Sequence, residues 1–221
     1  RHGAVSVMQY DADGILPEAL FNYLARLGWS HGDDEKFSRE QLVEWFDLDH
    51  VNRAPAQFNP DKLLWLNGEY MKEADNGRLA ALVAPRIERR GGGLGNGPAL
   101  EAVVALLKDR SRTLNELADG ALLFYREPVR SDAAAAEHLN AGGRAAVAAF
   151  RERAGGIAWE RAALNGLIKQ VVAELRVKMP QVAVPLRVAV TGQTQTPSID
   201  AVLELIGREV VMQRLDAALA S

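Results

Sequence analysis

The segment WERAALNGLIKQVVAELRV, residues 159–177, decides the fold class of this 221-residue sequence. Its apolar side chains recur every three or four positions, which is the spacing of one face of an α-helix. These side chains are Leu164, Leu167, Ile168, Val171, Val172 and Leu175. The segment therefore predicts an amphipathic helix with one face packed against a core.

Helix signals recur along the rest of the chain. Ser38 with Gln41 has the spacing of a capping box, in which side chain and backbone bond each other reciprocally. Asn59-Pro60 reads as an N-cap followed by a proline in the first helical turn. The tryptophans of these helical stretches are expected to anchor the core and not to stack on a ligand. They are Trp29, Trp45, Trp65 and Trp159.

A few segments interrupt this helical pattern. Residues 91–97 contain five glycines in seven positions, which predicts a loop or linker because glycine destabilises a helix interior. Residues 180–185 begin and end with proline and are expected to be extended. Weak strand signals occur at residues 4–7 and 187–190. The predicted fold class is therefore mainly α with little strand.

The composition excludes several classes of protein and site. Apolar residues make up 48% and charged residues 25%, which are ordinary values for a folded globular chain. The lack of cysteine excludes disulfides, thiolate zinc sites, iron–sulfur clusters and cysteine nucleophiles. No run of about 18 apolar residues is present, so no membrane span is expected. The chain starts at Arg1 without a signal sequence, so we expect a processed chain or a piece of a longer one.

Charge is distributed unevenly along the chain. Residues 1–70 hold 6 basic and 12 acidic side chains, net −6, whereas residues 71–221 hold 20 basic and 17 acidic side chains, net +3. A mildly basic second part hints at a polyanionic partner. The alternative is that so small an excess carries no functional meaning.

Signatures of catalysis are missing from the sequence. The histidines have no partner at helical spacing that would form a metal site. They are His2, His31, His50 and His138. No phosphate-binding loop and no nucleophile elbow occur, and the glycines of 91–97 do not fit the dinucleotide fingerprint. From the residues alone we expect no catalytic residue and no metal.

Blocks of sequence spread over the chain carry a family resemblance. They are RHGAVSV at 1–7, GILPEAL at 14–20, NYLARLGWS at 22–30, FNPDKLLWLN at 58–67 and PLRVAVTG at 185–192, followed by Thr196-Pro197 and Gly207-Arg208-Glu209. Together they closely resemble bacterial glutamyl-tRNA synthetases, in family order and over nearly the whole chain. Residues 91–97 and 132–149 match that family poorly.

The resemblance implies the C-terminal, tRNA-binding part of a class I synthetase, starting just after the KMSKS-type signature loop. Residues 1–70 would form a helical region like the stem-contact domain. Residues 71–125 and 126–221 would form two helical-bundle domains that bind the anticodon. The catalytic domain would precede Arg1, and Arg1 and His2 would lie beside its ATP site. ATP and Mg²⁺ would serve the intact ligase, whereas this piece alone is expected to need no cofactor and to be inactive.

The end of the chain offers groups suited to reading unstacked bases. An anticodon is recognised by stacking and by hydrogen bonds to base edges, and Arg187 supplies a planar, always-charged donor fork. Thr196 supplies a hydroxyl at an expected helix start, and Pro197 and Ile199 supply apolar surface. By resemblance, these four residues match the positions that contact the second and third anticodon bases. Two alternatives stay open: Arg187 pairs with an acid such as Glu204, and Thr196 is only an N-cap.

The first anticodon base is read elsewhere in the family, by an arginine of the preceding helical domain. Arg110 lies near that position and is preferred, with Arg112 as the alternate. A solvated arginine at a helix end is the competing interpretation. By resemblance, an arginine here favours a synthetase restricted to glutamate tRNA over one that also charges glutamine tRNA.

The sequence thus predicts an anticodon-recognising piece of a cytoplasmic glutamyl-tRNA synthetase. Its expected partner is the anticodon arm of glutamate tRNA, with no membrane or DNA partner, and the chain is expected to be a monomer. The alternative is a helical protein-interaction or scaffold domain that shares the fold without binding RNA. A tRNA gel shift at low and moderate salt distinguishes the two.

Overall fold

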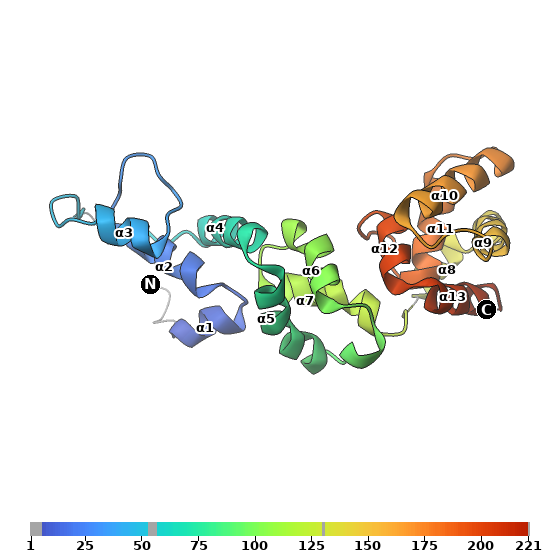
Figure 1. Cartoon of the computed structure of the whole chain (residues 1–221), viewed down its shortest axis with the longest axis horizontal. Helices are drawn as coiled ribbons and strands as arrows, with labels where there is room; N and C mark the ends of the chain where they lie inside the picture. The colour runs from blue at the N-terminus through green and yellow to red at the C-terminus, as the bar shows by residue number, and fades with distance from the viewer. Residues whose placement is uncertain (1–5, 53–56, 130, 221) are drawn as a thin grey trace. The chain divides into compact units, whose positions relative to one another are not determined.

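The computed structural model describes residues 6–52, 57–129 and 131–220 (Figure 1). Every regular element within these ranges is a helix. The extended pairing found there is an isolated bridge between Trp29 and Val51. The prediction of a mainly α fold is therefore confirmed.

The chain folds as two compact units, and each is discontinuous in sequence. Unit 1 comprises Arg1–Arg89 and Leu107–Gly120, and unit 2 comprises Arg90–Leu106 and Ala121–Ser221. The domain ranges expected from the sequence, 1–70, 71–125 and 126–221, stay a prediction.

Unit 1 is built from short helices with local caps. It holds α1 (Val7–Ala12), α2 (Pro17–Gly28), α3 (Arg39–Trp45), α4 (Pro60–Glu73), α5 (Asn76–Arg89), the 3-10 helix η2 (Lys108–Arg110) and the start of α7 (Leu114–Tyr125). The capping box between Ser38 and Gln41 opens α3 as predicted. Asn59 accepts from the Lys62 amide at the start of α4, also as predicted. These ends are fixed by local chemistry, and α2 then packs against α4.

A buried asparagine joins the two sequence segments of unit 1. The Asn67 side chain accepts from the Leu16 amide at 2.8 Å and donates to the Arg112 carbonyl. The Leu114 amide donates to the Gly14 carbonyl at 2.9 Å, beside this bridge. Because buried backbone groups must be paired, these bonds hold the segment from Leu107 onto the rest of unit 1.

The tryptophans of unit 1 differ in exposure. Trp29 is 4% exposed and lies edge-on to Phe37, with ring centroids 5.8 Å apart, so it anchors the core as predicted. Trp65 is 47% exposed, and the prediction is wrong for this residue. The reason is that α4 buries one face, through Leu63 and Leu66, and Trp65 lies on the other.

Unit 2 is a helical bundle. It holds η1 (Leu94–Asn96), most of α6 (Leu100–Leu107), the end of α7, α8 (Asp132–His138), α9 (Ala141–Ala154), α10 (Arg161–Leu175), α11 (Pro180–Thr191), α12 (Ile199–Ile206) and α13 (Arg208–Ala220). The helix predicted from residues 159–177 is α10, and it buries Leu164, Leu167 and Ile168. Helix α11 lies at the centre and packs against α8, α9, α10, α12 and α13 (Figure 1).

The central helix corrects two sequence predictions. Residues 180–185 are not extended, and residues 187–190 are not a strand, because both lie within α11. Pro180 is tolerated in the first turn, where its missing amide would be unpaired anyway. Pro185 lies inside the helix, but burial of Leu186 and its neighbours offsets the lost hydrogen bond. Of the other expected strand, 4–7, residues 4–5 lie outside the described residues and Val7 begins α1.

Gly192 closes α11 in a backbone conformation that side chains disfavour. Its φ is +74°, and its amide donates to the Val188 carbonyl at 3.0 Å. A Cβ atom at this position would lie 2.3 Å from the Val129 carbonyl oxygen. The turn that follows α11 therefore depends on glycine.

Replacing Gly192 with alanine should lower the free energy of unfolding by roughly 2 kcal/mol, because the left-handed conformation is strained and the adjoining backbone must move. Urea unfolding followed by far-ultraviolet circular dichroism measures this change. Gly166→Ala is the matched control, since Gly166 lies on α10 with open space around an added Cβ. That variant should be more stable by roughly 0.5–1 kcal/mol. A Gly192→Ala chain as stable as the wild type would contradict this account of the turn.

Candidate nucleic-acid interface

The structure brings Arg187 and Thr196 together. Arg187 lies on α11, and its Nε donates to the Thr196 hydroxyl at 3.2 Å. Both side chains are partly buried. The terminal amino groups of Arg187 make no hydrogen bond with the described residues, so they remain available to an acceptor from outside.

The charge of Arg187 is only loosely balanced by the protein. Burial lowers the pKa of Arg187, and the Asp200 carboxylate raises it in part. Glu204, the alternative partner considered from the sequence, instead accepts from the Arg161 amide at 2.8 Å. The alternative of an Arg187–Glu204 pair is therefore wrong, and the guanidinium keeps its capacity to bind an electron-rich group.

Thr196 does not start a helix. Helix α12 begins at Ile199 with Ser198 as N-cap, two residues later than the sequence suggested. The Thr196 hydroxyl donates to the Pro197 carbonyl at 2.8 Å while it accepts from Arg187. The interpretation of Thr196 as an N-cap is wrong, because its hydroxyl orients the turn and not the helix end.

The apolar candidates lie beneath this turn. Ile199 is 6% exposed and Pro197 is also buried, so their side chains support the turn from inside. The exposed residues that precede Thr196 are Gln193, Thr194 and Gln195.

A buried carboxylate lies under the same turn, and sequence reasoning did not find it. Asp200 accepts from Arg161 Nε at 3.1 Å and from Asn165 Nδ2 at 3.4 Å. Burial raises the pKa of Asp200, but hydrogen bonds from Ser198 and Arg161 outweigh it, and the net pKa is lowered. The sequence signal that could have found it is an acid in the first turn of a helix.

Arg110 and Arg112 belong to unit 1 and differ in availability. Arg112 is exposed and pairs with Glu116, with Nη2 and Oε1 3.1 Å apart. Arg110, at the end of η2, is exposed and makes no hydrogen bond or ion pair with the described residues. Arg110 is thus the less constrained cation of the two. Arg1 and His2, the other candidates, lie outside the described residues.

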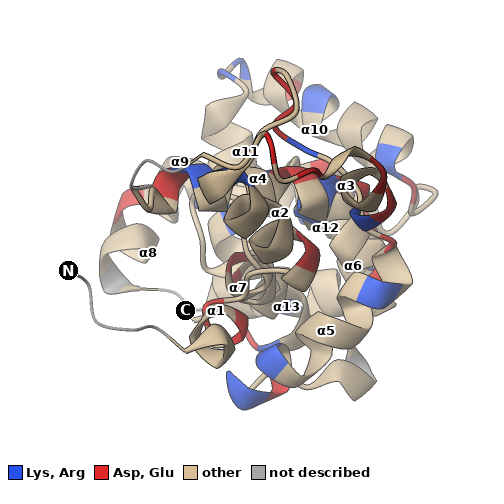
Figure 2. Ribbon diagram, turned by 90° about the vertical axis from the view of Figure 1, so that its left-hand side faces the viewer, with Lys and Arg blue, Asp and Glu red and all other residues tan. Residues whose placement is uncertain are grey.

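Acidic surface is concentrated elsewhere in unit 1. Figure 2 shows aspartate and glutamate along the loops that flank α3. Asp33, Asp34 and Asp49 in these loops are exposed. This surface repels phosphate, whereas Arg187 offers an available cation in unit 2.

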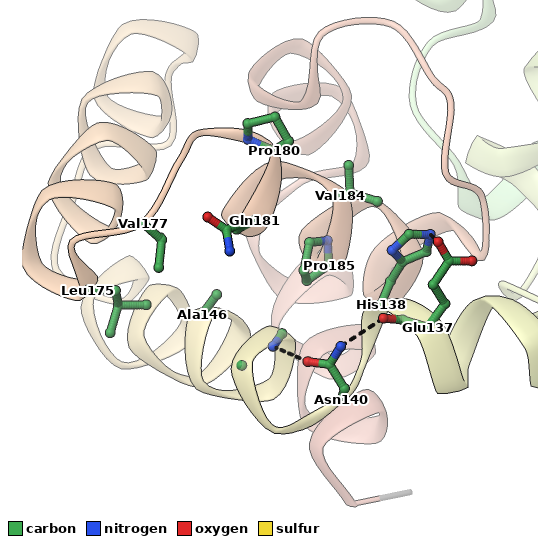
Figure 3. Close-up of a pocket in the computed structure, with 12 residues that line it drawn as sticks. Glu137, His138, Asn140, Ala146, Leu175, Val177, Pro180, Gln181, Val184 and Pro185 are labelled. Atoms are coloured by element: carbon green, nitrogen blue, oxygen red, sulfur yellow. Dashed lines mark hydrogen bonds and ion pairs between the residues drawn. The ribbon is translucent and has the colours of Figure 1, made fainter.

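A cavity of about 330 Å³ lies in unit 2 among residues of α8, α9, α10 and α11 (Figure 3). Its walls include Leu175, Val177 and Pro185. Asn140 donates to the Glu137 carbonyl and accepts from the Gly143 amide, so its hydrogen bonds serve the start of α9. The side chains of Glu137, His138 and Gln181 also line the cavity, and His138 Nε2 lies 3.6 Å from Glu137 Oε1.

The part of the chain that the structure describes has no cluster of three or more histidine, aspartate or glutamate side chains that could hold a metal ion. Nor does any described helix combine the length and apolar character needed to cross a membrane.

Comparison with known proteins places these features in context. A family model described as "Anticodon binding domain" matches residues 78–219, and a model described as "tRNA synthetases class I (E and Q), catalytic domain" matches residues 1–65. The glutamate–tRNA ligase of Janthinobacterium sp. (strain Marseille) is 59% identical over 97% of this chain and 46% of that protein. The glutamate–tRNA ligase of Azoarcus sp. (strain BH72) is 62% identical over the same shares.

The fold also matches a solved structure. A glutamate tRNA ligase from Elizabethkingia meningosepticum CCUG26117, in complex with its amino acid, superposes with a TM-score of 0.85 at 22% identity. The match covers 96% of this chain and 42% of that one. At this identity it supports the fold alone. The chain spans about half the length of the curated relatives it matches.

Proposed function

Since this chain belongs to the anticodon-binding family of the glutamate–tRNA ligases, we propose that it binds the anticodon arm of glutamate tRNA, with Arg187 and Thr196 reading the second and third bases. The observation that carries the proposal is the Arg187–Thr196 hydrogen bond of 3.2 Å, which leaves the guanidinium tips unused. Anticodon bases are unstacked, so their edges are accessible to such donors. A planar fork held at Nε presents its other donors in a fixed direction.

Pro197 and Ile199 contribute by shaping the turn from below. Arg110, with Arg112 as the alternate, contacts the first anticodon base, and an arginine there favours glutamate tRNA over glutamine tRNA. Residues 1–70 form the stem-contact-like region, and residues 71–125 and 126–221 form the two anticodon-binding domains. The protein acts as a monomer in the cytoplasm.

The intact protein ligates glutamate to its tRNA with ATP and Mg²⁺, and the ATP-site role expected of Arg1 and His2 falls outside the described residues. The described residues include no cluster of histidine, aspartate or glutamate side chains for a metal, so no residue is assigned here to hold Mg²⁺ or ATP. No step through ATP is therefore assigned to this chain. By itself it binds tRNA without charging it.

Binding of labelled glutamate tRNA, followed by fluorescence anisotropy, tests the proposal. The association constant should fall as salt rises, with a log–log slope set by the number of phosphates that the chain neutralises. A tRNA with substituted second and third anticodon bases is the control and should bind more weakly. Absence of binding at low salt and micromolar protein would favour the alternative, a helical protein-interaction domain that shares the fold without binding RNA.

A further inference from the structure

We infer that Arg161 is a positioning residue that holds the turn of residues 196–200 in its RNA-reading form, an inference that rests on the proposed function. Arg161 is the first residue of α10. Its Nε donates to Asp200 at 3.1 Å, and its Nη2 donates to the Ser198 hydroxyl at 3.1 Å. One guanidinium thus ties two residues of the turn to a different helix.

The carboxylate that Arg161 contacts is buried, whereas its own side chain is not. The Asp200 side chain is 9% exposed and that of Arg161 is 59% exposed. A buried carboxylate is stable only when its oxygens are bonded. Loss of Arg161 therefore pulls Asp200 toward water and moves the turn with it.

Arg161 is itself held in place. The Arg161 amide donates to Glu204 at 2.8 Å, and Trp159 Nε1 donates to the Leu203 carbonyl at 2.9 Å. The Arg208 guanidinium lies 5.5 Å from the centre of the Trp159 ring and donates to the Ile157 carbonyl. The residues that lead into α10 are thus bound to α12 and α13, and these contacts fix the position of the Arg161 guanidinium.

Two arginines from different helices hold one turn. Arg187 bonds Thr196, whereas Arg161 bonds Ser198 and Asp200. The N-terminus of α12 has no side-chain cap, because the Ser198 hydroxyl faces these partners instead. A shift at Ser198 and Asp200 displaces Thr196, and with it the hydroxyl that orients Arg187.

The planar geometry of the Arg161 guanidinium, and not only its charge, is needed to hold the turn. A lysine keeps the charge but cannot donate from two fixed nitrogens to both Ser198 and Asp200. If Arg161 instead contacted an RNA phosphate directly, lysine would serve nearly as well, and the salt dependence of binding would change when the charge is removed.

The variant Arg161→Lys distinguishes positioning of the turn from direct contact with an RNA phosphate, because it keeps the charge and loses the fork. The variant Arg161→Gln removes the charge as well. The matched control is Arg151→Lys, since Arg151 makes a similar fork, with Nε and Nη2 at 2.6 and 2.9 Å from the Asp216 oxygens, in the same unit. Amide hydrogen exchange of residues 193–200 is measured in the free chain. Affinity is measured for glutamate tRNA and for the tRNA with substituted second and third anticodon bases, over a range of salt.

For Arg161→Lys we expect faster exchange in the turn and a roughly 10-fold loss of affinity for glutamate tRNA, the size of one displaced hydrogen-bonded group. Binding of the substituted tRNA and the salt slope should stay unchanged, and Arg151→Lys should match the wild type. Equal losses for both tRNAs, a smaller salt slope in Arg161→Gln, or unchanged exchange would each overturn the inference. A wild-type chain that binds neither tRNA would overturn the proposed function and this inference together.

Discussion

Replacing Arg187 with alanine should weaken binding of glutamate tRNA by roughly 1–3 kcal/mol, about 5- to 150-fold in the dissociation constant. The expected loss is large because the guanidinium tips of Arg187 have no hydrogen-bond partner among the described residues and are the donors assigned to the bases. Burial already lowers its pKa, so the side chain is partly desolvated before RNA arrives. Fluorescence anisotropy at fixed salt measures the change.

The control for Arg187→Ala is the tRNA with substituted second and third anticodon bases. Wild type and variant should bind that RNA almost equally, because the base contacts are already absent. Arg187→Lys should recover little of the loss, since an ammonium lacks the planar fork. Equal weakening for both tRNAs would show that Arg187 supplies charge and no base readout.

Replacing Arg214 with methionine should lower the free energy of unfolding by about 3–5 kcal/mol. Arg214 is 6% exposed on α13. Its guanidinium donates to the carbonyls of Leu123, Val190 and Arg126, at 3.2, 3.0 and 2.8 Å. Methionine fills much of the volume but leaves these carbonyls without that donor in the interior of unit 2.

Urea unfolding followed by far-ultraviolet circular dichroism measures the effect of Arg214→Met. Arg151→Met is the matched control, because Arg151 lies on the surface and pairs with a single carboxylate of α13. An exposed pair contributes about 1 kcal/mol or less. If the two variants unfold at the same urea concentration, the carbonyl contacts of Arg214 do not stabilise the bundle.

Helix ends and the amphipathic helix could be predicted from the sequence because their causes are local. The Ser38–Gln41 box and the Asn59 cap each act within three residues. Likewise, the apolar spacing of residues 159–177 can be recognised within a single segment, without knowledge of its packing partners. Helix α10 covers Arg161–Leu175 of this segment. The membership of Arg187 and Thr196 in one site could be predicted because both lie in family-like blocks nine residues apart, but the hydrogen bond between them could not.

The structural features that could not be predicted from the sequence depend on contacts between distant segments. Helix α11 forms through Pro185 because the five helices packed around it bury its apolar side chains, and no local signal reports that environment. Arg161 and Asp200 meet across 39 positions, so neither residue stands out when the chain is read in order. Trp65 is exposed because partners cover only the other face of α4.

The split sequence of unit 1 has a consequence for synthesis on the ribosome. When residue 89 has left the exit tunnel, Asn67 still lacks the Arg112 carbonyl and Gly14 still lacks the Leu114 amide. Unit 1 reaches its final packing only after Gly120 has emerged from the ribosome. By then the first segment of unit 2, Arg90–Leu106, has already left the exit tunnel. Vectorial folding of this chain is therefore interleaved, and a gene truncated after residue 89 would encode a unit that lacks its closing segment.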